Sequence, residues 1–103
     1  MGDNARVASV LEEVADLLEL KEDSFFQVRA YRRAAREISA LTGDIRDLYV
    51  RGHLDQVPGV GKAIRDKVIE VLRTGELQYL KDLQNEFPAG LLQVMQVPDI
   101  GPK

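Results

Sequence analysis

The stretch VPGVGK, residues 57–62, contains two glycines at the spacing of a turn that can hold a phosphate. Glycine has no side chain to obstruct a ligand, so main-chain N–H groups approach a phosphodiester closely, and the following helix adds its positive dipole end. Such a hairpin contacts the sugar–phosphate backbone and recognises position on a strand rather than base sequence. In the alternative interpretation it only connects two helices. The residues we expect at DNA from this segment are Gly59, Val60, Gly61, Lys62, Arg65 and Lys67.

Four arginines on the preceding segment form a second cationic feature: Arg29, Arg32, Arg33 and Arg36. At about 100° per residue they share one face of a helix, opposite the apolar face around Tyr31 and Ile38. A bound phosphate would relieve their mutual repulsion, so we expect all four at the DNA-binding surface. In the alternative interpretation this face is solvated and is balanced by carboxylates of the first helix, namely Glu12, Asp16 or Glu19.

Lys67 differs from the other cations in its position on the helix. Helical spacing places it at the edge of the apolar stripe formed by Ile64, Val68 and Val71. An amine there is partly desolvated, which favours its neutral form, and a neutral amine beside DNA can attack an aldehyde to form a Schiff base. In the alternative, Lys67 is a surface lysine whose stem covers apolar surface.

The net charge of −3 on this chain of 103 residues argues against nucleic acid, but the charge is unevenly distributed. Residues 1–24 carry two basic and seven acidic side chains, whereas residues 25–75 carry ten basic and six acidic ones. The local excess of cations decides whether phosphate is bound.

Composition excludes several other classes of site. The chain has no cysteine and a single histidine, so a disulfide framework, a Cys-based zinc site and a histidine cluster are excluded. No apolar run is long enough to cross a membrane and the start lacks an apolar signal core, so we expect a cytoplasmic protein.

Helical periodicity without sustained alternation predicts an all-α fold, a compact helical bundle with a helix-hairpin-helix motif. We expect helices over 4–20 with Asp3 or Asn4 as N-cap, from Ser24 to about 41, over about 44–51, from the hairpin at 58–61 to Thr74, over 77–87, and briefly over 91–95. Gly52 and Gly75 are expected to end two of these helices.

The last residues, VPDIGPK at 97–103, repeat the pattern of the first hairpin. The second copy stops where its helix should begin, which indicates a piece cut from a longer protein. We therefore expect a helical DNA-binding domain over residues 1–87, and over residues 88–103 the start of a second helix-hairpin-helix that leads into a missing portion.

Two blocks, FFQVRAYRRAAREI at 25–38 and VPGVGKAIRDKVIEVLRTGEL at 57–77, resemble the amino-terminal domain of family X DNA polymerases, the bacterial and archaeal members most of all. The resemblance implies a polymerase-beta-like helical domain of the 8-kDa type. It implies binding to the 5′-phosphate side of gapped or nicked DNA during gap filling and base excision repair, as a monomer and without sequence preference. The nucleotidyltransferase site and its divalent metal are expected only in the missing polymerase portion.

The resemblance also implies roles for single residues. The carbonyls of Asp55, Val57 and Val60 match positions that hold a monovalent cation, Na⁺ or K⁺, in the family. Lys67 matches the Schiff-base nucleophile of members with 5′-deoxyribose-phosphate lyase activity. Asp66 matches the neighbouring carboxylate, and Tyr31, the tyrosine of the A-Y-R block, is expected at the DNA.

This sequence departs from the family at the residues that bind the phosphate. The phosphate-binding lysines of the animal repair enzyme correspond to Gln27, Ala63 and Tyr79, and its template-stacking histidine corresponds to Phe26. Arg65 also replaces a small residue, while Lys62, Arg29 and Arg33 are candidates for replacement charge. Three hypotheses follow: a DNA-binding module, a slow lyase centred on Lys67, and a protein–protein module with a purely structural hairpin.

Overall fold

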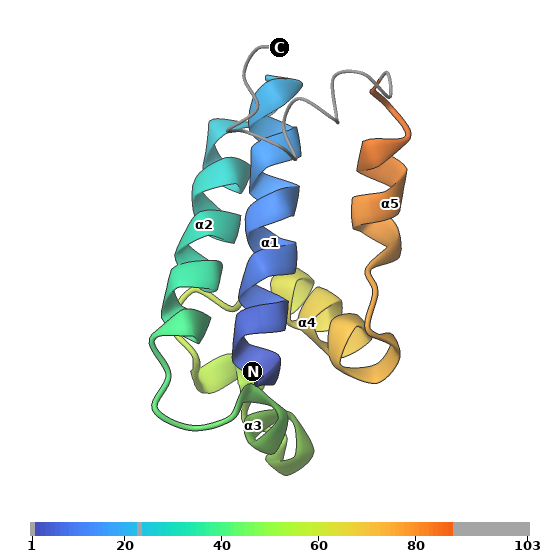
Figure 1. Ribbon diagram of the computed structural model, residues 1–103. Coiled ribbons are helices and arrows are strands. Elements are labelled where there is room, and N and C mark those ends of the chain that lie inside the picture. Colours follow the sequence, from blue (N-terminus) through green and yellow to red (C-terminus); the bar gives the residue numbers. More distant parts are fainter. Residues whose placement is uncertain (1, 23, 88–103) are drawn as a thin grey trace, which may run out of the picture.

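The computed structural model describes residues 2–22 and 24–87, and no strand occurs within these ranges, which confirms the all-α prediction. The elements in chain order are α1 Asp3–Leu20, α2 Phe25–Ser39, α3 Ile45–Arg51, the 3₁₀ helix η1 Leu54–Gln56, α4 Lys62–Thr74 and α5 Gln78–Gln84 (Figure 1). The sequence pattern did not predict η1, and α5 ends earlier than expected. The predicted helix over 91–95, the second hairpin and the domain boundary at residue 88 lie outside the described residues.

Helix α1 is the central element of the fold. It runs antiparallel to α2 and has α5 on its other side (Figure 1), and it also contacts α3 and α4. Its apolar residues recur at helical spacing, and Val7, Leu11, Val14 and Leu18 are fully buried. Burial of each leucine contributes about 1.5–3 kcal/mol. Ala34 and Ala35 of α2 are also buried, and their small side chains let the two helices approach closely.

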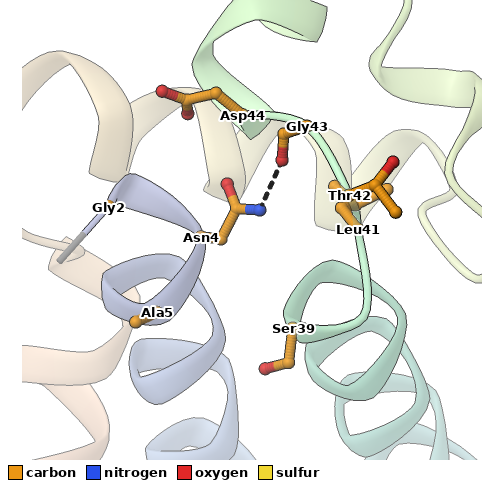
Figure 2. A pocket seen from close by; sticks show the side chains of 8 residues that line it. All are labelled: Gly2, Asn4, Ala5, Ser39, Leu41, Thr42, Gly43 and Asp44. Atoms are coloured by element: carbon orange, nitrogen blue, oxygen red, sulfur yellow. Dashed lines mark hydrogen bonds between the residues drawn. The ribbon is translucent and has the colours of Figure 1, made fainter.

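The expected N-cap of the first helix is wrong in a way that reveals a tertiary contact. Gly2 occupies the N-cap position of α1, and Asn4 lies inside the helix. The Asn4 Nδ2 donates to the Gly43 carbonyl at 2.7 Å, as Figure 2 shows, and the Asn4 Oδ1 accepts from the Ile45 amide at 2.7 Å. Since Ile45 is the first residue of α3, Asn4 satisfies an unpaired amide of that helix rather than of its own.

Arg46 connects three helices at the same end of the molecule. Its Nε lies 2.7 Å from the Asp3 Oδ2 of α1, and its other guanidinium nitrogen donates to the Leu72 carbonyl in the last turn of α4 at 2.8 Å. The hydrogen bond from Arg46 lowers the pKa of Asp3 below its ordinary value. Helix α3 is therefore held against both α1 and the end of α4.

The predicted ends of two helices are confirmed. Gly52 follows α3 and Gly75 follows α4, each as a C-cap in the left-handed region, with φ of 76° and 83°. In the part of the chain that the structure describes, no helix combines the length and the apolarity needed to span a bilayer.

Candidate nucleic-acid interface

The hairpin between η1 and α4 has a buried side and an open side. Val57 and Val60 are buried, and the Val60 amide donates to the Val57 carbonyl at 3.0 Å, which closes the turn. Gly59, between them, has a φ of 86°, in the region that favours glycine. The two valines thus fix the hairpin to the core, and the turn between them depends on glycine.

Gly61 differs from Gly59 because no conformational strain requires glycine there. Its φ is −83° and its ψ is −173°, ordinary extended backbone, and a Cβ built on it would have no heavy atom within 4 Å. Gly61 is also the N-cap of α4, so that helix begins without a side-chain cap. Amides in an uncapped first turn can donate hydrogen bonds to an anion. At Gly61, therefore, a ligand has free access to the backbone and the first amides of α4 have no side-chain cap.

A pocket of about 580 Å³ lies beside this open side. It is lined by α2, the hairpin, α4 and α5 through Gln27, Ala30, Tyr31, Gly59, Gly61, Lys62, Ala63, Ile64, Lys67 and Tyr79. Gln27, Ala63 and Tyr79, the positions at which the resemblance expects phosphate-binding lysines, all line it. The pocket thus brings together four of the six predicted hairpin residues, and Lys62 and Lys67 are among the four.

Two tyrosines and a lysine form one stack within this pocket. The buried Tyr31 ring lies 6.3 Å from the Tyr79 ring, centre to centre, at an interplanar angle of 22°. Burial and the neighbouring Tyr79 raise the pKa of Tyr31 to about 12, so its hydroxyl remains protonated at neutral pH. The Lys67 Nζ lies 4.7 Å from the centre of the Tyr79 ring, within cation–π range.

The predicted stripe-edge position of Lys67 is confirmed, since it is half-buried beside the buried Ile64 and Val68. Its contact with Tyr79 was not predicted. Tyr79 comes from another helix, so no pattern within the sequence of α4 could indicate that contact.

The four arginines of α2 do not share one environment. The Arg32 guanidinium lies 2.8 Å from Glu12, 3.0 Å from Asp16 and 2.6 Å from Glu19, all carboxylates of α1. Desolvation would lower the pKa of Arg32, but hydrogen bonds to these carboxylates outweigh it and raise the pKa. The alternative interpretation, an arginine balanced by the acidic first helix, therefore describes Arg32. In helical projection Arg32 is the arginine nearest the buried face, which places it at the junction with α1.

The other three arginines are exposed, and no described residue forms an ion pair with them. The Arg29 guanidinium carbon lies 5.9 Å from the centre of the Phe25 ring. Phe25 and Phe26 are 69% and 82% exposed at the start of α2. The stem of Arg33 lies along the hairpin, since its Cγ would be 3.2 Å from a Cβ built on Gly59.

The remaining predicted residues lie around the hairpin. Lys62 and Asp66 are exposed, and Arg65 is half-buried, on α4. Asp55 belongs to η1, and the Val57 carbonyl already accepts the Val60 amide, which leaves one lone pair for a cation. A monovalent cation there stays a prediction. Among the described residues, no three His, Cys, Asp or Glu side chains gather in a group that could hold a metal ion.

Comparison with known proteins finds similarity over a region that includes the hairpin. The sequence model of a family described as helix-hairpin-helix domain matches residues 2–77. A protein of Bacillus subtilis (strain 168), named DNA polymerase/3'-5' exonuclease PolX, is 34% identical over 97 residues. The alignment covers 94% of this chain and 16% of that protein, so this chain spans only a small part of the relative's length.

Proposed function

Since this chain belongs to the helix-hairpin-helix domain family, we propose that it is a DNA-binding module that contacts the sugar–phosphate backbone without reading base sequence. It also resembles the amino-terminal region of a bacterial family X polymerase. From this we propose binding at the 5′-phosphate side of gapped or nicked DNA during repair, as part of a longer polymerase.

The observation that carries this proposal is the pocket beside the hairpin. Gly61 leaves the start of α4 open, and Lys62 and Lys67 line the same pocket. Arg29 and Arg33 add exposed positive charge on α2. A terminal phosphate carries more negative charge than an internal phosphodiester, which favours an end or a gap as the ligand.

A substitution at Gly61 tests the proposal without straining the backbone. We expect Gly61→Val to weaken binding to gapped DNA by about tenfold or more, because its side chain would stand where the phosphate approaches. Gly43→Val is the matched control, since a Cβ at Gly43 also has no heavy atom within 4 Å and Gly43 lies outside the pocket.

The measurement is fluorescence anisotropy at two salt concentrations. The DNAs are a gapped duplex with a 5′-phosphate, the same duplex with a 5′-hydroxyl, and an intact duplex. We expect the 5′-phosphate duplex to bind most tightly. A folded Gly61→Val protein with unchanged affinity would contradict the backbone contact, and no binding at either salt concentration would leave a protein–protein module as the function.

Lyase activity is a second candidate, supported by the position of Lys67 in the same pocket as Tyr31 and the hairpin glycines. The Lys67 amine would attack C1′ of an abasic deoxyribose to form a Schiff base with loss of water. Loss of a C2′ proton would then permit β-elimination of the 3′-phosphate ester.

The contact with Tyr79 makes us expect slow lyase chemistry, because the amine must leave the ring before it can attack. Borohydride should trap an adduct in wild-type protein and in Lys62→Ala, but not in Lys67→Ala. Absence of any wild-type adduct would leave binding as the only function.

A further inference from the structure

The contact between Arg33 and the hairpin distinguishes this arginine from the other three on α2. We propose that Arg33 binds the same phosphodiester as the hairpin, and that Gly59 is the residue that lets it do so. This inference rests on the proposed DNA-binding function and assigns a binding role within it to one arginine.

The geometry at Gly59 places the stem of Arg33 directly on the hairpin backbone. A Cβ built on Gly59 would lie 3.2 Å from the Arg33 Cγ, 3.3 Å from its Cδ and 3.5 Å from its Nε. The first two distances are shorter than ordinary van der Waals contact, so a side chain at residue 59 would push the Arg33 stem away by a few tenths of an ångström. Glycine thus leaves room for the Arg33 stem and also suits the φ of 86° at this position.

The charge of Arg33 is available to a ligand. Arg33 is exposed, and none of the described carboxylates forms an ion pair with it. Arg32, the adjacent residue, is bonded to three carboxylates of α1. Arg29 lies over Phe25 at the start of the helix. Of the four arginines, Arg33 is the one whose aliphatic stem lies next to the hairpin, at Gly59.

Contact with the hairpin has a consequence for binding. A free arginine loses much of its rotamer entropy when it is fixed on a ligand. The stem of Arg33 already lies along the hairpin, so part of this loss occurs on folding. The hairpin and the guanidinium therefore approach a phosphodiester as one unit.

Variants that separate the stem of Arg33 from its charge test the inference. Arg33→Met keeps an aliphatic stem against Gly59 and removes the charge, and Arg33→Lys restores the charge. In titrations of gapped DNA at several salt concentrations, we expect Arg33→Met to make the salt slope shallower by about one, with Arg33→Lys restoring it. A purely structural role would not change this slope. Arg73→Met, at the opposite end of α4 from the hairpin, should leave the slope unchanged.

A double-mutant comparison tests the role of Gly59. Gly59→Ala should weaken DNA binding, and adding Arg33→Met should weaken it little further, because the alanine already moves the Arg33 stem off the hairpin backbone. Gly52→Ala is the matched control, since Gly52 has a φ of 76° but no heavy atom near its Cβ position. Gly52→Ala should lower the stability of the protein through backbone strain, but it should leave the salt dependence of DNA binding unchanged.

The outcomes distinguish this inference from the function on which it rests. If Arg33→Met leaves the salt slope unchanged while Gly61→Val still weakens binding, the inference is wrong and DNA binding stands. If the wild-type protein binds no gapped DNA, the proposed function itself is wrong. If Gly59→Ala does not fold, the Arg33→Met and Arg33→Lys pair still decides the role of Arg33.

Discussion

Replacing Asn4 with alanine should destabilise the protein far more than its place in the first turn of a helix suggests. Asn4 makes two hydrogen bonds of 2.7 Å, one to the Gly43 carbonyl and one from the Ile45 amide. The first is exposed, so its loss should cost about 0.5 kcal/mol. The second is partly buried beside the fully buried Ile45 side chain, and an amide left unpaired there costs about 1–2 kcal/mol. We therefore expect Asn4→Ala to lower the free energy of unfolding by about 2 kcal/mol.

Urea denaturation followed by circular dichroism measures this change, and a thermal scan should show a fall in Tm of about 8 °C or more. Asn4→Asp is the matched variant. It keeps an oxygen for the Ile45 amide, and its charge is favourable at the start of α3, but it loses the donor to Gly43. We expect Asn4→Asp to lower the free energy of unfolding by less than half as much as Asn4→Ala does. If Asn4→Ala stays within about 0.5 kcal/mol of wild type, the two hydrogen bonds of Asn4 do not hold α3.

Three further predictions follow from features at other places in the fold. Glu22 has a φ of 56°, so Glu22→Gly should raise the free energy of unfolding by about 0.5–1 kcal/mol in urea, and an unchanged midpoint would count against strain there. Arg46 lowers the pKa of Asp3 from its ordinary value of 3.8, so the stability that this pair contributes is fully present above that pH and is lost as pH falls through the folded-state pKa. The difference in free energy of unfolding between wild type and Asp3→Asn should therefore be constant near neutral pH and disappear in acid. A difference that stays constant down to pH 2 would refute this prediction. Removing the ring beside Lys67 by Tyr79→Ala should increase the yield of borohydride adduct relative to Tyr79→Phe, and equal yields would show that the ring does not restrain the amine.

The helices and their ends could be predicted because their signals are local. The apolar spacing of Val7, Leu11, Val14 and Leu18 specifies one face of α1 whatever packs against it. Gly52 and Gly75 mark helix ends because glycine adopts a positive φ without strain. Neither signal depends on knowing the tertiary structure.

The site could be predicted only in part, since its remaining features depend on which helices meet. Helical projection groups Arg32 with the other arginines, but the packing of α1 against α2 places it among three carboxylates. The hydrogen bonds of Asn4 join the start of α1 to α3, whereas capping preferences concern only residues next to each other in the sequence. The stack of Tyr31 on Tyr79 likewise joins α2 to α5.

The uncapped start of α4 has a consequence for engineering the stability of this protein. Serine or aspartate at residue 61 would fit the observed backbone and cap α4, with a gain of a few tenths of a kcal/mol over glycine. That side-chain oxygen would bond the amides that a phosphate is proposed to bind, so the protein would carry its own competing ligand. Stability and affinity should therefore change in opposite directions at this one residue, and a selection for thermal tolerance alone would favour variants that have lost DNA binding.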